Sequence, residues 1–161
     1  MTAVKIWDPR KLIRETIGTE RFINNEDAYT ITVTNNRGDS LYIPLYLPVE
    51  IHKETPPPLP YIEMKISSIP ARTGNIGGDI HISQAYMDFD ITYVPRTNII
   101  DGNFGEIVAG EILDLIMTHR ATVGMYMEVA NDGHESFENF GGKHIIYHRI
   151  MEIYSRQMQK K

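Results

Sequence analysis

The chain has 161 residues, with 16 Lys and Arg against 21 Asp and Glu, 42% hydrophobic residues and no Cys. The lack of Cys excludes disulfide frameworks, Cys-ligated zinc, iron–sulfur clusters and thiol nucleophiles. The formal charge of −5 argues against binding nucleic acid by neutralising its phosphates. No apolar run approaches the ~20 residues of a membrane span. The composition therefore predicts a soluble protein with no membrane partner, and it requires no cofactor.

The N-terminal part predicts a short helix. Asp8 has the chemistry of an N-cap, Pro9 fits the first helical position, and Gly18 is a natural stop. One side of this helix carries the apolar residues Leu12, Ile13 and Ile17. A helix this short cannot be stable alone, so we expect it to pack on another element.

A β-hairpin is predicted over residues 28–47. The run 28–34 alternates Tyr and β-branched apolar residues with Thr, residues 35–39 form a turn, and alternation resumes from Leu41. Because Pro44 lacks a ladder donor, the second arm is expected at a sheet edge. Residues 48–60 hold five of the nine prolines and are interpreted as a surface loop between two strands. A domain linker and a proline segment that docks on a partner are the alternatives.

The next segments predict a strand over 61–69, a mobile loop over 70–78, and a long strand over 80–93 with a bulge near Gln84. Apolar spacing then predicts a helix of about sixteen residues from near Asn103 to near His119. A strand over 123–129 and a polar loop over 131–142 follow.

The last segment fits either a strand or a helix. We favour a strand over 143–157, with 156–161 as a frayed cationic tail. The fold predicted is α+β, a mostly antiparallel sheet with one long amphipathic helix and the short N-terminal helix on one face. It forms a single domain over 1–161, with the 28–47 hairpin and the 48–60 loop as decorations.

Two patterns of acidic residues could serve catalysis or metal binding. Glu63 and Lys65 project from one side of a strand as an E-x-K pair, which Mg²⁺-dependent nucleases use to hold the metal and orient water. The simpler interpretation is two solvent-facing charges. Asp88 and Asp90 share a strand face and could act as paired carboxylates or bind a hard cation. We interpret them as an ordinary solvent-facing strand surface, since no third acid falls on an identifiable neighbour.

The remaining motifs are weak. His144 and His148 could bind zinc on a helix, but they lack a third ligand and are interpreted as structural. The glycines near 74–78 and 102–105 match neither a P-loop nor a dinucleotide fingerprint. No activated nucleophile can be drawn from the sequence. We therefore predict no catalytic, cofactor-binding or metal-binding residues.

The order of these elements resembles a known family. A short N-terminal helix, the strand PYIEM at Pro60, the strand AYMDFDITYV, the helix GNFGEIVAGEILDLI and the closing strands that contain GGKHIIYHRIMEIYS are similar to tail-terminator and head–tail joining proteins of tailed bacterial or archaeal viruses. The likeness spans residues 60–156 and consists of elements and hydrophobicity.

This resemblance implies a structural virion protein of the neck, assembled in the host cytoplasm. It implies a homo-oligomeric ring, taken as a hexamer, that caps the tail tube and docks to the head connector, with DNA only as passing cargo. The loops 70–78 and 131–142 would order on assembly. The residues expected at interfaces are Arg72, Asn75, Asp88, Asp90, His134, Phe137 and Phe140, with Asp88 and Asp90 as candidates to face the channel. The alternatives are the nuclease and an adaptor that binds a peptide at its sheet edge.

Overall fold

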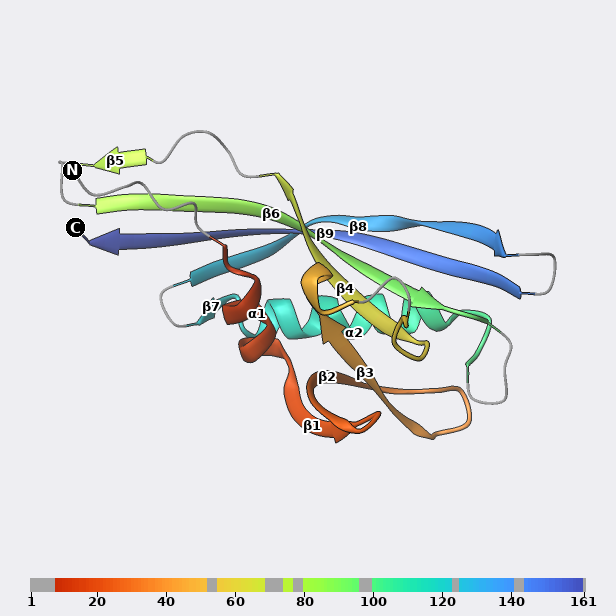
Figure 1. The fold of residues 1–161 in the computed structure, drawn as a ribbon. Coiled ribbons are helices and arrows are strands. Elements are labelled where there is room, and N and C mark those ends of the chain that lie inside the picture. Colours follow the sequence, from red (N-terminus) through yellow and green to blue (C-terminus); the bar gives the residue numbers. More distant parts are fainter. Residues whose placement is uncertain are drawn as a thin grey trace.

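The computed structural model describes residues 8–51, 55–68, 74–76, 80–95, 100–122, 125–140 and 144–160. Within these ranges one mostly antiparallel sheet packs with two α-helices (Figure 1), which confirms the predicted mixed class and the character of the sheet. The helices are α1 (Arg10–Ile17), the short 3₁₀ helix η1 (Pro48–Glu50) and α2 (Phe104–Thr118). The strands are β1 (Thr19–Ile23), β2 (Glu26–Thr34), β3 (Ser40–Tyr46), β4 (Tyr61–Ser68), β5 (Gly74–Ile76), β6 (Ile80–Tyr93), β7 (Ala121–Thr122), β8 (Met125–Phe140) and β9 (His144–Lys160).

The strand order in the sheet is β1-β2-β3-β4-β6-β9-β8-β7, and β5 pairs with β6 outside this path. The long strands β6, β9 and β8 form a ribbon that projects past α2 at both ends (Figure 1). Helix α2 contacts β2, β6, β8 and β9, so it lies across both halves of the sheet.

Helix α1 ends at Gly18, as predicted, but its N-cap is Pro9 and not Asp8, so the helix begins one residue later, at Arg10. The carboxylate of Asp8 accepts a hydrogen bond of 3.1 Å from the backbone N–H of Arg10. At the other end the N–H of Gly18 donates to the carbonyl of Arg14, and a Cβ at Gly18 would lie 2.7 Å from that oxygen. The close approach explains why the helix stops at a glycine.

Strand β1 was not predicted. Its residues are almost all exposed, so it lacks the apolar alternation that indicates a strand. It joins β2 through Asn24 and Asn25, which both have positive φ angles, of 51° and 64°. Two consecutive residues with left-handed backbone conformations are typical of a two-residue hairpin turn. In the sequence, the signal for this turn is the Asn24-Asn25 pair.

The hairpin of β2 and β3 is confirmed, but the edge position of β3 is wrong. Strand β3 lies between β2 and β4. Its parallel pairing with β4 involves only Leu45 and Tyr46, and so begins one residue after Pro44. The proline therefore limits the length of this pairing without placing the strand at an edge.

Strands β6 and β9 pair without interruption from Ile80 opposite Lys160 to Tyr93 opposite Tyr147. The predicted bulge near Gln84 is wrong, because the register shift of this region lies in β4, between Ile66 and Ser68. The C-terminal segment is a strand, as favoured. The predicted frayed tail is wrong as far as Lys160, which pairs with β6.

The predicted polar loop 131–142 is wrong for residues 131–140, which belong to β8. The sequence Asn131-Asp132-Gly133 forms a bulge in this strand, where the register with β9 shifts. The side chain of Asn131 accepts a hydrogen bond of 2.7 Å from the N–H of Gly133, whose φ is +90°. Residues that usually form turns, Asn-Asp-Gly, thus form a bulge inside a long strand. Of the predicted loop 70–78, residues 74–76 form β5 and the rest lies outside the described residues.

The core lies between the sheet and the helices. Alternate residues of β6 are fully buried, and they cluster with one side of α2. The β2–β3 hairpin contributes to the same cluster. Its largest fully buried members include Ile13, Ile31, Ile43, Leu45, Ile62, Met64, Met87, Phe89, Ile91, Tyr93, Phe104 and Ile112.

We predict that Gly133→Ala destabilises the fold by about 1–3 kcal/mol, because a Cβ there would overlap the carbonyl of Ile150 on β9. Urea unfolding measures the change. Gly38→Ala is the matched control, since Gly38 also has a positive φ, of 86°, but open space around its Cβ position. Equal losses in the two variants would contradict the steric explanation.

Candidate functional site

The sheet face turned away from the core, here called the outer face, carries a cluster of polar side chains. Pairing across strands brings Glu63 of β4 opposite Asp90 of β6, and Thr92 of β6 opposite His148 of β9. These positions have the opposite parity to the buried residues Met64, Phe89 and Ile91. The cluster therefore follows from strand alternation on three adjacent strands.

Lys65 connects the carboxylates of the cluster. Its Nζ lies 2.8 Å from Glu63 Oε1 and 3.5 Å from Asp90 Oδ2. The hydrogen bond to Glu63, with the charges of both acids, raises the pKa of Lys65. Because the Lys65 side chain is 47% exposed, solvent screens these ion pairs and they contribute little to stability.

Asp90 is the most deeply buried charged residue of the cluster, with only 7% of its surface exposed. Its Oδ1 lies 3.0 Å from His148 Nδ1, which is also 3.2 Å from Thr92 Oγ1. A buried carboxylate is costly unless it is paired and hydrogen-bonded. His148 and Lys65 meet this requirement from the two neighbouring strands.

This geometry changes the interpretation of the paired carboxylates. Asp88 and Asp90 share the outer face, as predicted, but Asp90 does not lie on a wet surface. The expected lack of a neighbouring acid is also wrong, since Glu63 stands opposite Asp90 and Glu152 opposite Asp88. The sequence does not reveal these two acid pairs, because β4 and β9 are separated from β6 along the chain.

The other residues expected at interfaces have different positions. Asn75 lies on β5, opposite His81 of β6. His134, Phe137 and Phe140 lie on β8, paired with β9, and not in a loop. Arg72 lies outside the described residues. The structure brings Asp88 and Asp90 together on one face, and it places the β8 residues along the far strand of the ribbon. His148 has a structural partner in Asp90, and His144 lies on the same strand.

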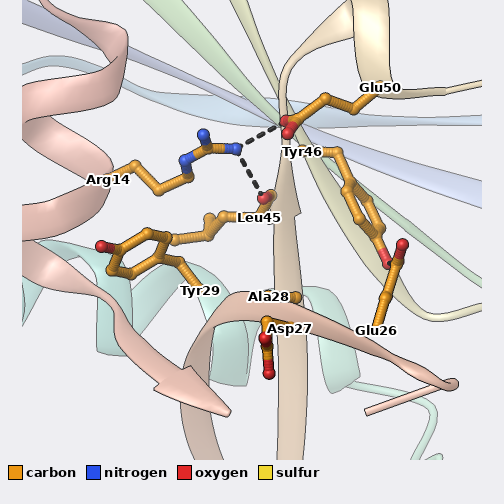
Figure 2. A pocket seen from close by; sticks show the side chains of 8 residues that line it. All are labelled: Arg14, Glu26, Asp27, Ala28, Tyr29, Leu45, Tyr46 and Glu50. Carbon is orange, nitrogen blue, oxygen red and sulfur yellow. Dashed lines mark hydrogen bonds and ion pairs between the residues drawn. The ribbon is translucent and has the colours of Figure 1, made fainter. Parts of the chain in front are cut away.

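A second polar site was missed by sequence reasoning. Between α1, β2 and the end of β3 lies a hollow of about 170 Å³ (Figure 2). Its polar side chains come from separate elements, Arg14 from α1, Glu26 from β2 and Glu50 from η1. No motif joins these residues, so nothing in the sequence could have found the site.

Within the described ranges, no group of three or more His, Asp or Glu side chains could hold a metal ion. The described helices include none long and apolar enough to cross a membrane. No protein-family model matches the chain, and no curated protein matches it.

We predict that stability falls as the pH rises above about 10 and that Tyr61→Phe makes this fall less steep. Burial, with the charges of Glu63 and Asp90, raises the pKa of Tyr61 above 10.0, and that of Lys65 is raised above 10.5. A raised pKa means that the folded state holds the proton more tightly, so the stabilisation is complete below the unfolded value and is lost above it. Urea unfolding between pH 8 and pH 11.5 measures the slope, with Tyr42→Phe on exposed β3 surface as the control. Equal slopes in the two variants would contradict the prediction.

Proposed function

We propose that this chain is a structural subunit of the viral neck, a tail terminator that forms a ring on the tail tube and docks to the head connector. The neck location comes from the order of elements that resembles head–tail joining proteins. The observation that supports the assembly role is the exposed face of α2, where open space at Gly110 lies beside the exposed Leu113 and Met117.

Gly110 is the central residue of this face. It lies in the middle of α2, and a Cβ there would meet nothing within 4 Å. Glycine inside a helix costs roughly 0.8–1.0 kcal/mol relative to alanine. Nothing among the described residues packs over it, so the fold of the monomer does not explain its presence.

Two apolar side chains, Leu113 and Met117, follow Gly110 on one side of α2, which also carries the exposed acids Glu106 and Asp114. Leu113 and Met117 are 36% and 57% exposed, and positions three and seven residues along a helix share its face. Burying a Leu or Met side chain fully contributes about 1.5–3 kcal/mol. The open space beside the glycine, next to these two apolar side chains, suits the close approach of a second element from a neighbouring subunit.

The outer face offers a second surface of different character. Tyr86 and Tyr154 stack with ring centroids 5.0 Å apart, and Arg156 lies over the ring of Tyr126 at 4.8 Å. Tyr and Arg are enriched in the residues that dominate binding at protein interfaces. A head-to-tail ring needs two unlike surfaces on each subunit, and the α2 face and the outer face meet this need.

The first measurement is the mass of the purified 18.5 kDa chain by light scattering, with electron microscopy of the same sample. We expect a ring of about six subunits, closed by heterologous contacts. A strict monomer at all concentrations would count against self-assembly.

We predict that Gly110→Ala separates folding from assembly. It raises the free energy of unfolding of the monomer by about 0.4–1 kcal/mol, because alanine restricts the unfolded chain and favours helix. It also weakens the ring, because a methyl group occupies the space of the contact. Glu111→Ala is the control, since it lies on the same helix but points roughly 100° away. A Gly110→Ala ring as stable as that of the control would contradict the role of this face.

A Mg²⁺-dependent nuclease is the second candidate, and one observation favours it. Asp90 stands beside Glu63 and Lys65, so two carboxylates and a lysine converge from adjacent strands. Mg²⁺ is held by one or two carboxylates together with water and substrate phosphates. Cleavage of DNA in Mg²⁺ or Mn²⁺ that is abolished by Glu63→Ala, and retained by the outer-face control Glu152→Ala, supports this candidate. Lack of cleavage in either metal excludes it.

A further inference from the structure

Strand β8 has an open edge over most of its length. On one side it pairs with β9 from Met125 to Phe140, apart from the bulge. On the other side the short strand β7 pairs only with Met125 and Tyr126, and among the described residues no further strand pairs with this side. The end of β8 projects past α2 together with β9 (Figure 1). Such an edge offers backbone groups to an additional strand.

One hydrogen bond shows which backbone groups of β8 point to the open edge. The N–H of Met127 donates to the carbonyl of Arg120 at 2.9 Å, so the backbone groups of Met127 point away from β9. Met127 stands opposite Ser155 of β9. Backbone groups alternate in direction along a strand, and β9 pairs with β6 without interruption. The β8 residues opposite the odd-numbered residues of β9 therefore point to the edge.

Beyond the bulge, three residues of β8 meet this condition. They are Glu135, Phe137 and Asn139, which stand opposite residues 149, 147 and 145 of β9. Each presents one N–H and one C=O to the edge, because the residues between them use these groups to pair with β9. The edge of residues 134–140 thus carries a regular row of three donors and three acceptors.

The segment 134–140 also lacks the features that usually protect a sheet edge. Its sequence, HESFENF, contains no Pro and no Lys, and its pairing with β9 has no register shift from His134 to Phe140. Charged Lys, Pro and bulges are the common means of preventing strands from adding to an edge. The bulge of β8 precedes this segment, so it limits the length of the edge without blocking it.

The row of backbone groups is complementary to itself. When two copies of β8 lie antiparallel about a two-fold axis at Phe137, Phe137 stands opposite Phe137, and Glu135 stands opposite Asn139. All the edge-directed groups of both copies then form hydrogen bonds. An axis at Ser136 would place Asn139 opposite the bulge, and an axis at Glu138 would place Glu135 beyond the end of the strand. The axis at Phe137 therefore gives the fullest pairing.

The same register separates the negative charges. It places Glu135 opposite Asn139 and Glu138 opposite Ser136, so no glutamate faces a glutamate of the other copy. Like charges directly opposite one another destabilise a strand pair. Backbone pairing and charge therefore favour the same register, and both favour a second copy of this chain as the added strand.

We propose that two copies of this chain join through the β8 edge, antiparallel about a two-fold axis at Phe137, and form a sheet that continues from one subunit into the other. The contact is isologous and uses a different surface from the α2 face. It goes beyond the proposed ring, whose contacts are heterologous, and it does not depend on that ring.

The test is cross-linking through introduced cysteines, which is specific because the chain has no Cys. In Phe137→Cys the two Cα atoms of the pair would lie about 5.5 Å apart, which is within the range of a disulfide. We expect mild oxidation of the dilute variant to give a linked dimer of twice 18.5 kDa on a non-reducing gel. Absence of this dimer would overturn the proposal and leave the edge to a strand of a different protein.

Glu135→Cys is the matched control. Its two copies would lie four residues apart along the strands, roughly 14 Å, which is too far for a disulfide. Equal cross-linking of Glu135→Cys and Phe137→Cys would overturn the register. The double variant Glu135→Cys with Asn139→Cys keeps Phe137 and should cross-link, because residue 135 of one copy stands opposite residue 139 of the other. This variant tests the register even where Phe137→Cys folds poorly.

Proline tests whether the backbone makes the contact. Phe137→Pro removes an N–H that points to the edge and none that pairs with β9, whereas Phe137→Ala keeps this N–H. Loss of the two central hydrogen bonds should raise the dissociation constant of the dimer at least about tenfold in Phe137→Pro relative to Phe137→Ala. Light scattering over a concentration series measures the constants, and circular dichroism checks the fold. Equal constants in the two variants would overturn pairing through the backbone.

The cross-link and the ring are separate outcomes. A ring that forms without the Phe137→Cys cross-link contradicts the β8 contact and leaves the ring proposal standing. A cross-linked dimer without a ring supports the β8 contact and counts against the ring. The two proposals therefore fail separately.

Discussion

The uninterrupted register between β6 and β9 is the constraint on which the rest of the structure depends. Fourteen residues of β6, from Ile80 to Tyr93, each have a fixed partner on β9. Because side chains alternate across a strand, a slip of one residue would exchange the core and outer faces. The buried apolar residues of β6 make such a slip expensive. The register therefore determines which side chains meet α2 and which meet each other on the outer face.

The same constraint explains why Asp90 is buried although it faces away from the core. Strand pairing places Lys65 on one side of it and His148 on the other, and these neighbours cover the carboxylate. A cluster of this kind is compatible with a purely structural role, since Asp90 is paired with both Lys65 and His148. It is also where the E-x-K pair of Glu63 and Lys65 gains Asp90 from the adjacent strand β6. Of the two candidate functions, the nuclease is the one that depends on this cluster.

The proposed assembly face coincides with a departure from local helix preference. Gly110 lies in the middle of α2, and nothing among the described residues packs over it. Natural sequences are locally consistent with their fold, and departures from this consistency concentrate at functional sites. Our proposal therefore places a partner at the α2 face.

The sequence by itself determined the elements whose signals are local. The glycine stop of α1, the period of α2 and the alternation of β2, β4 and β6 all predicted elements that the structure contains, because helix stops and burial patterns act within a few residues. The exposed strand β1 and the bulge at Gly133 were missed, since turn chemistry alone does not separate a loop from a bulge or a tight hairpin. Only the tertiary structure decided that β3 is internal, that Asp90 meets Glu63 and that Arg14 meets Glu50. These outcomes depend on pairing between segments far apart in the chain, and no local pattern encodes that pairing.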